Sequence, residues 1–218
     1  MFELKRANGI KIIISLNIIC ISLLIFSLNS NMMETKIIED GEITYLGWEI
    51  DGFTSEPYDN DEIDYSILCS PITQSTSDTS TTDIFCDFEE SGNFLKPMIY
   101  IGIIIISFST FYLVSLLNKW DIFTEKTINY IDKYIFLLPL LIITLGFALW
   151  FIISPTNSDI DISFSEMDYE STKTTFSTAT ISIILSLMMG LFSFSSNRNW
   201  RIHKHWNSRN KQPKKSKN

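Results

Sequence analysis

The sequence predicts an all-α membrane protein, a four-helix transmembrane bundle that carries a small extracellular β-sheet formed by its two outer loops. Three observations predict this fold. Four charge-free stretches, each 22 to 25 residues long, divide the chain of 218 residues: 12–33, 97–118, 134–158 and 174–197. Basic residues gather on one side of these stretches and acidic residues on the other. The two acidic segments contain strand-like patterns and a pair of cysteines.

Each charge-free stretch is long enough to span the hydrocarbon core of a bilayer, because about 30 Å of helix takes roughly 20 residues. Their apolar residues face all directions, which is typical of a lipid environment. We therefore expect four spans at 12–31, 97–117, 134–154 and 176–196. The first, preceded by Lys5, Arg6 and Lys11, also resembles a secretory signal peptide. A retained span is favoured, because SLNSN offers no small-x-small cleavage site.

Charge partition predicts the orientation of the spans. Of the 17 Lys and Arg residues, 14 lie in the segments 1–11, 118–133 and 197–218. The loops 32–96 and 155–175 hold 16 and five acidic residues. Because positive loops stay on the cytoplasmic side, we expect both termini in the cytoplasm and the two acidic loops outside.

The spans lack the groups that membrane enzymes and pumps use. No Asp, Glu, Lys, Arg or His lies well inside any of them, whereas ion paths, proton relays and intramembrane catalytic sites depend on such residues. Catalytic and phosphate-binding motifs are absent, and the only histidines, His203 and His205, lie in the basic tail. We expect no enzyme, metal, cofactor, small-molecule substrate or nucleic-acid partner.

The outer loops have strand character. Asp40-Gly41 separates two apolar runs, as in a tight hairpin. In the second loop, Ile160, Ile162 and Phe164 alternate with polar residues, which predicts a strand. We expect the two loops to pair into one sheet. The acidic cluster at 59–64 is interpreted as a solvated, self-repelling loop in preference to a weak Ca²⁺ site, because it does not fit an EF-hand loop.

Cys69 and Cys86 lie in the first outer loop, where an oxidising compartment favours a disulfide. Free reactive thiols are the competing interpretation. A bridge of this span is expected to stabilise the fold by about 3 kcal/mol on the loop-entropy estimate. The polar segment between the two cysteines, QSTSDTSTTD, is expected to be a solvated loop. Cys20, inside the first span, is expected to be a small apolar residue.

Four spans, inner termini and a long first outer loop with Trp48 ahead of two cysteines resemble the claudin and peripheral-myelin-protein superfamily. Claudins carry a Gly-Leu-Trp signature before the cysteine pair; here the order is Leu46-Gly47-Trp48, and Cys69 lies 21 residues beyond the tryptophan instead of a few. Cys86-Asp87-Phe88 also resembles the residues after the second claudin cysteine. The sequence resembles equally well the four-span fungal cortex proteins, which have a claudin-like first loop. The resemblance implies a small outer β-sheet and no transferable pore residue.

Small residues recur at four-residue spacing in the fourth span, at Ser182, Ser186 and Gly190. Such residues let a neighbouring helix approach closely. A contact within one chain is the simpler interpretation and a subunit interface the alternative. Asn17 in the first span is expected to hydrogen-bond to a neighbouring helix, and Pro139 and Gly146 permit a bend in the third.

The tail is strongly basic and contains no acidic residue. A segment of this kind next to a membrane is attracted to anionic lipid of the inner leaflet; a simple topology determinant is the alternative. The basic residues are Arg198, Arg201, Lys204, Arg209, Lys211, Lys214, Lys215 and Lys217.

These features predict a multi-pass membrane protein that organises membrane domains or cell-surface contacts through its outer loops, as the resemblance to claudins implies. An auxiliary subunit of a channel or receptor is the alternative. An ion channel is less favoured, because Ser107, Ser109, Thr110 and Thr144 offer only a thin polar line. Expected partners are lipids, a second copy of the chain or other membrane proteins. The plasma membrane is the expected location, with an endomembrane as the alternative.

Overall fold

The computed structural model describes residues 2–50, 52–56, 59–65, 69, 79–118, 120, 134–165 and 171–210. Four helices in this part of the chain are long and apolar enough to cross a membrane, and each overlaps one of the predicted spans: Asn8–Leu28, Asp83–Leu117, Leu138–Ser163 and Thr178–Asn197. The protein is therefore mostly helical, with the composition and helix lengths of a multi-pass membrane protein.

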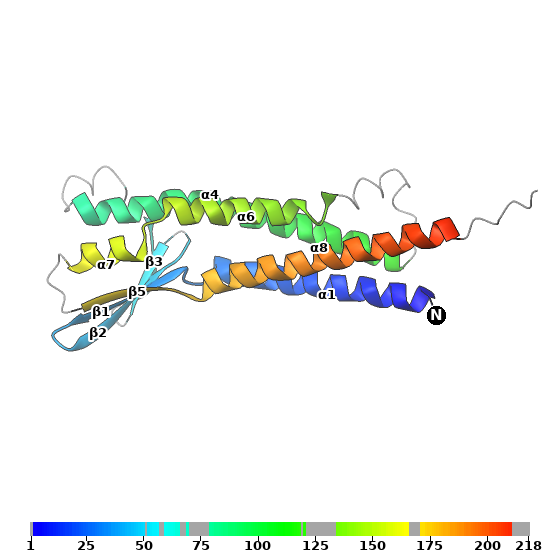
Figure 1. Ribbon diagram of the computed structural model, residues 1–218. Coiled ribbons are helices and arrows are strands. Elements are labelled where there is room, and N and C mark those ends of the chain that lie inside the picture. The colour runs from blue at the N-terminus through cyan, green and yellow to red at the C-terminus, as the bar shows by residue number, and fades with distance from the viewer. Residues whose placement is uncertain are drawn as a thin grey trace, which may run out of the picture.

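The bundle consists of two helix pairs. Helix α1 (Phe2–Leu28) packs along α8 (Thr178–Asn210), and α4 (Thr79–Leu117) packs along α6 (Leu138–Ile153). The two pairs meet mainly where α1 contacts α4. Helix α1 begins and α8 ends at one end of the bundle, and the β-sheet lies at the other end (Figure 1).

Two helices are much longer than a membrane requires. Helix α4 has 39 residues, which corresponds to about 58 Å at 1.5 Å per residue, against a hydrocarbon core of about 30 Å. Its first part projects past the other helices and lies over the sheet (Figure 1). Helix α8 is 33 residues long and continues at the opposite end through the first half of the basic tail. The long helices therefore extend the bundle in opposite directions.

Several helices begin or end at other residues than the predicted spans and loops. The polar segment between the cysteines is not a loop throughout, because α4 begins at Thr79; residues 74–78 lie outside the described part. Ile84, Phe88, Leu95 and Ile99 are all buried and recur at helical spacing, so one apolar stripe crosses the expected boundary at residue 97. In the third span, α6 begins only at Leu138, with Pro139, which has no amide hydrogen to donate, in its first turn.

The other two helices also differ from the predicted spans. Helix α1 ends at Leu28, three residues before the expected end, and α8 begins at Thr178 because Phe176 belongs to a strand.

Helix α6 packs closely inside the bundle. Its Trp150 is fully buried and stacks on Phe147, with ring centroids 5.8 Å apart. A Cβ on Gly146 would lie 2.6 Å from Cβ of Met98, so this glycine lets α6 approach α4 closely.

Five antiparallel strands form one sheet in the order β4-β3-β2-β1-β5. They are β1 (Met33–Glu39), β2 (Glu42–Trp48), β3 (Gly52–Glu56), β4 (Asp59–Asp64) and β5 (Ser171–Phe176). The first four come from the first loop and β5 from the second, so the expectation that both loops build one sheet is confirmed. The predicted hairpin is also present, with positive φ at Asp40 (51°) and Gly41 (81°), the backbone that a two-residue hairpin turn requires.

The strand predicted at 160–164 is wrong, because residues Asn157–Ser165 form helix α7. A reciprocal cap starts this helix: the Thr156 hydroxyl donates to the Asp159 carboxylate at 2.7 Å, and the Asp159 amide donates to the Thr156 hydroxyl oxygen at 3.3 Å. Ile160 is fully buried, whereas Ile162 is 56% exposed. The alternating sequence therefore follows helical geometry, and the strand of the second loop lies downstream, at β5.

The sheet is attached rigidly to the bundle. The carbonyl of Met32 accepts bonds from the Ser177 amide at 3.0 Å and the Thr180 hydroxyl at 2.7 Å. The carbonyl of Asn31 accepts the Ala179 amide at 3.1 Å. These bonds join the end of α1 to the start of α8 at the point where β1 and β5 leave the bundle, so the strands continue directly from the helices.

Candidate functional site

The candidate site is the head, defined here as the five-stranded sheet, α7 and the first part of α4, residues 79–96. Trp48 of the predicted Leu46-Gly47-Trp48 motif lies at its centre and is fully buried. Its ring stacks on Phe88 of α4 at a centroid distance of 4.8 Å and lies 5.5 Å from Phe85. The tryptophan therefore fastens β2 to the projecting part of α4.

A chain of hydrogen bonds runs from Trp48 across the sheet. Its indole N–H donates to the hydroxyl of Thr35 on β1 at 2.8 Å, and this hydroxyl lies 2.8 Å from that of Thr174 on β5. The Thr174 hydroxyl donates to the Asp161 carboxylate of α7 at 2.7 Å. Because Thr174 gives its one proton to Asp161, Thr35 must donate to Thr174.

This chain crosses three strands and joins both outer loops. Thr35 and Thr174 are buried and face each other in the register of β1 with β5. A buried hydroxyl without a partner costs about 1–3 kcal/mol, so every link constrains the next. The backbone carbonyl of Asp161 also accepts the Thr172 hydroxyl at 3.0 Å. The first and second loops are thus one structural unit.

The disulfide expected between Cys69 and Cys86 is present, with the two Cα atoms 5.3 Å apart. It connects the chain after β4 to α4, next to the aromatic cluster. Tyr65, which is fully buried, stacks on Phe88 at 5.8 Å, and its carbonyl accepts the Cys69 amide at 2.9 Å. The bridge therefore closes the side of the head where β4 forms the edge of the sheet.

Gly92 allows α4 to lie against the turn that follows β2. A Cβ at this position would overlap the backbone carbonyl oxygen of Ile50. Because the obstacle is backbone, it has little freedom to move aside. Glycine is needed here for close approach, and any side chain would push α4 away from the sheet.

The head carries a cluster of carboxylates on its α4 side. Burial raises the pKa of Asp87 above the usual aspartate value, and the negative charges of Asp83, Glu90 and Asp159 raise it further. Asp87 lies ten residues before the charge-free part of α4, about 15 Å along the helix. No group of three or more metal-ligating side chains occurs among the described residues. This surface is strongly acidic, as the charge partition predicts.

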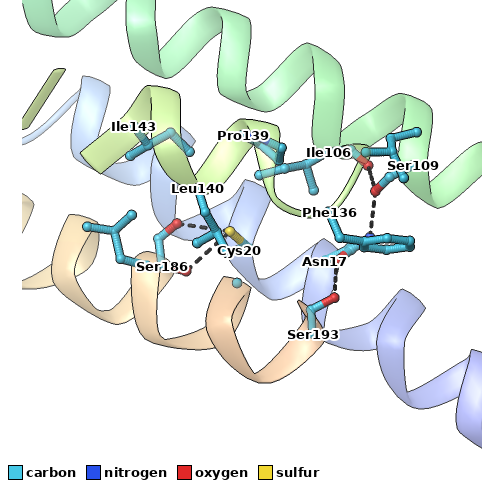
Figure 2. Close-up of a pocket in the computed structure, with 13 residues that line it drawn as sticks. Asn17, Cys20, Ile106, Ser109, Phe136, Pro139, Leu140, Ile143, Ser186 and Ser193 are labelled. Atoms are coloured by element: carbon cyan, nitrogen blue, oxygen red, sulfur yellow. Dashed lines mark hydrogen bonds between the residues drawn. The ribbon is translucent and has the colours of Figure 1, made fainter. Parts of the chain in front are cut away.

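A polar cluster inside the bundle holds three helices together (Figure 2). The amide of Asn17 on α1 donates to the hydroxyls of Ser109 at 2.9 Å and Thr110 at 3.2 Å, both on α4. Its carbonyl oxygen accepts the Ser193 hydroxyl of α8 at 2.9 Å. The expected hydrogen bond from Asn17 to a neighbouring helix is therefore confirmed, and it reaches two helices.

The small residues of α8 face the interior of the same bundle. Ser182 and Ser186 are buried, and the Ser186 hydroxyl lies 2.9 Å from the Cys20 thiol. A Cβ on Gly190 would lie 2.6 Å from Cδ2 of Leu140, so this glycine lets α8 approach α6. Ser186 and Gly190 therefore serve contacts between helices of the same chain, and Ser182 is buried beside them, as in the simpler interpretation.

The cavity between these helices is small. It has a volume of about 20 Å³ and lies between the Asn17 cluster and the first turns of α6 (Figure 2). One water molecule needs roughly 10–15 Å³ by the same measure, whereas ligand pockets typically hold about 300 Å³ or more. This cavity accommodates neither a substrate nor a continuous ion path, although polar residues line it.

The structure describes only the first part of the predicted basic tail. Arg198, Arg201, Lys204 and Arg209 belong to α8, which runs to Asn210. Lys211, Lys214, Lys215 and Lys217 lie outside the described residues.

The acidic cluster expected to be a loop has regular backbone structure. It forms strand β4 at the edge of the sheet, which contains Asp59, Asp61, Glu62 and Asp64.

Comparison of the sequence with protein-family models finds no match, and no curated protein matches it. The resemblance to claudins therefore rests on the topology, on Leu46-Gly47-Trp48 and on the cysteine pair.

Sequence reasoning missed Thr35, Thr174 and Asp161. Nothing in their spacing reveals that they lie in one line, because that depends on the register of β1 with β5. The cap of α7 had a recognisable signal, since Thr156 and Asp159 follow the capping-box spacing.

Proposed function

We propose that the protein is a claudin-like organiser of membrane domains or cell-surface contacts, acting through the head. The observation that carries this proposal is the hydrogen-bond chain from Trp48 to Asp161, which unites both outer loops. A head of this kind binds a partner without changing shape, because the entropy of ordering its two loops is already lost when the protein folds. We assign no catalytic role to it.

The charge distribution supports the assigned orientation. Of the 25 acidic residues, 21 belong to the two loops that build the head, and 14 of the 17 basic residues belong to the segments on the other side of the spans. We therefore propose that the head is extracellular and that the basic end of α8 lies against the anionic inner leaflet. The small central cavity favours an organiser over an ion channel.

The hairpin of β1 and β2 is the part of the head best placed for contacts. It projects away from the bundle at the end of the sheet (Figure 1), and it exposes Ile43 (44%) and Tyr45 (39%) beside acidic residues of the turn. Exposed apolar side chains with a polar rim are typical of protein interaction surfaces. We propose this hairpin as the contact element, with a second copy of the chain as the expected partner.

Site-specific photo-crosslinking in living cells tests this function. A photoreactive amino acid replaces Ile43 in the hairpin or, as the matched control, Ile152, which is 77% exposed on α6. We expect protein adducts from position 43 that contain a second copy of the chain, and lipid adducts from position 152. A larger membrane protein captured at equal stoichiometry would favour the auxiliary-subunit alternative. Protein adducts at position 43 no more abundant than at position 152 would contradict both.

A further inference from the structure

A second cavity lies on the opposite face of the sheet from Trp48, near the bundle. Its volume is about 330 Å³, and it is lined by Asn31, Glu34, Tyr45, Gly47 and Thr54. This volume is within the range of small-molecule sites in proteins, roughly 300–1,000 Å³. Of these residues, Tyr45 also belongs to the proposed contact surface of the hairpin, whereas Asn31, Glu34, Gly47 and Thr54 do not.

The sheet register brings the lining together. Glu34 on β1 faces Gly47 on β2, and Gly47 faces Thr54 on β3. A Cβ on Gly47 would lie 2.6 Å from both Cγ of Asn31 and Oγ1 of Thr54. The place of a Cβ on Gly47 is thus taken by the side chains of Asn31 and Thr54, and the glycine lets these two polar groups lie close against β2 in the lining of the cavity.

The polar groups that line the cavity are not used within the fold. Among the described residues, no hydrogen bond or ion pair involves the side chains of Glu34, Tyr45 or Thr54. Glu34 is partly buried, and the Tyr45 ring is 39% exposed. Lys36 lies next on the same face of β1 but is not part of the lining. The cavity thus presents one free carboxylate, one aromatic ring and two neutral polar side chains.

The cavity lies at the level where the helices leave the membrane. Helix α1 ends at Leu28, and the Asn31 carbonyl accepts the amide of Ala179 in the first turn of α8. Asn31 is thus level with the ends of two spans, and Glu34 is three residues further along the chain, about 10 Å for a strand. With the ends of α1 and α8 at the bilayer surface, these positions would fall in the headgroup layer.

We propose that this cavity binds the ammonium-bearing headgroup of a phospholipid of the outer leaflet, phosphatidylcholine or phosphatidylethanolamine. The Glu34 carboxylate faces the ammonium group, and the Tyr45 ring adds a cation–π contact, as in other sites for quaternary ammonium ions. The Asn31 amide, nearer to the membrane, donates to the phosphate. This order matches the headgroup, whose phosphate lies closer to the acyl chains than its ammonium does.

Native mass spectrometry of the purified full-length protein tests the proposal. The protein is incubated with equimolar phosphatidylcholine, phosphatidylethanolamine and phosphatidylglycerol that carry identical acyl chains. We expect one site that retains the two ammonium lipids about tenfold over phosphatidylglycerol, since cation–π and charge contacts of this kind add up to about one power of ten in affinity. Equal retention of all three lipids would overturn the proposal.

Two variants locate the effect. Glu34→Gln should reduce retention of the ammonium lipids to that of phosphatidylglycerol, and Tyr45→Leu should reduce it severalfold. Glu39→Gln, which removes the same charge at the exposed end of β1, should leave the preference unchanged. Unfolding midpoints equal to that of the unsubstituted protein show that the variants are folded. Retention in Glu34→Gln equal to that in Glu39→Gln would overturn the assignment.

Carbodiimide coupling in cell membranes distinguishes a lipid amine from a protein amine at the same site. Activation of the Glu34 carboxylate and attack by a primary amine form an amide. We expect the adduct to be phosphatidylethanolamine. A Glu34 adduct to a lysine of another protein would overturn the lipid assignment and identify the cavity as a protein contact. This result is independent of crosslinks from Ile43, so the two proposals fail separately.

Discussion

The indole N–H of Trp48 and the carboxylate of Asp161 are the two ends of one hydrogen-bond chain that crosses the sheet through Thr35 and Thr174. Trp48 belongs to the first outer loop and Asp161 to the second. The chain therefore converts two loops that are separated by two spans into one head. The predictions below follow from this connection and from the contacts that hold the head on the bundle.

Removing the central link of the chain should destabilise the head. Thr174→Val keeps the size of the side chain but leaves the Thr35 hydroxyl without its acceptor and Asp161 without one donor. We expect a loss of about 1–3 kcal/mol in the free energy of unfolding. Thr175→Val, on the exposed face of the same strand, should change it by less than about 0.5 kcal/mol. Thermal unfolding in detergent measures both, and equal effects would contradict the importance of the chain.

A methyl group at Gly92 should displace α4 from the sheet, because it would overlap the carbonyl of Ile50. We expect Gly92→Ala to lower the unfolding midpoint strongly and to increase the accessibility of Trp48 to a fluorescence quencher. Gly9→Ala is the matched control: it changes a helical glycine with no atom within 4 Å of the added Cβ, and alanine favours a helix by about 0.5–1 kcal/mol. A Gly92→Ala protein as stable as Gly9→Ala would refute the close packing.

The disulfide should act as one unit. Cys69→Ser, Cys86→Ser and the double variant should each lose about the same stability, about 3 kcal/mol, because each removes the same bridge. Unfolding midpoints under oxidising conditions measure these losses. Addition of reductant should lower the midpoint of the unsubstituted protein and leave those of the three variants unchanged. Additive losses in the double variant would mean that the thiols contribute separately.

The Asn17 cluster should contribute to association of the spans. Asn17→Leu removes the bonds to Ser109, Thr110 and Ser193, and interhelical bonds in membranes are worth about 0.6 kcal/mol each. We therefore expect a loss of about 1–2 kcal/mol. Asn29→Ala, whose side chain bonds only to its own helix at Ile25, is the control. Equal unfolding midpoints for the two variants would show that the cluster adds nothing.

The raised pKa of Asp87 predicts a pH dependence. A carboxyl whose folded pKa lies above the usual 3.8 costs stability when it ionises, and this cost grows as pH rises from the usual pKa through the raised one. Asp87→Asn should therefore be more stable than the unsubstituted protein at neutral pH, and the difference should vanish below the usual aspartate pKa. Unfolding midpoints between pH 3 and 8 measure this difference. A difference that does not change with pH would exclude ionisation as its cause.

Features that depend on local residue types could be predicted from the sequence. The four spans follow from charge-free length, the hairpin from Asp40-Gly41 and the bridge from two cysteines in one outer loop. Features that depend on pairing between distant segments could not. The alternation at Ile160, Ile162 and Phe164 fits a strand, but the cap from Thr156 and the burial of Ile160 alone favour a helix. The strand of the second loop that pairs with β1 is therefore β5, and the sequence of β5 shows little alternation of apolar and polar residues.

The candidate site divides in the same way. Trp48 was singled out by the resemblance of Leu46-Gly47-Trp48 to the claudin signature, although that resemblance did not predict its contacts. Thr35 and Thr174 are ordinary strand residues, and only the register places one hydroxyl opposite the other. The length of α4 was underestimated because its buried stripe continues through a segment rich in Ser, Thr and acidic residues, whose composition is typical of a loop.

The pairing of β1 with β5 outside the membrane is the central claim, and one engineered disulfide tests it most directly. Lys36 and Lys173 are partners in the register, and Cα atoms of such pairs lie about 4.5–5.5 Å apart, within the range of a disulfide. In intact cells, Lys36→Cys with Lys173→Cys should form a bridge that a membrane-impermeant reductant opens, while Glu39→Cys with Lys173→Cys should not. Absence of the first bridge, or protection of it from the reductant, would contradict a single extracellular head built from both loops.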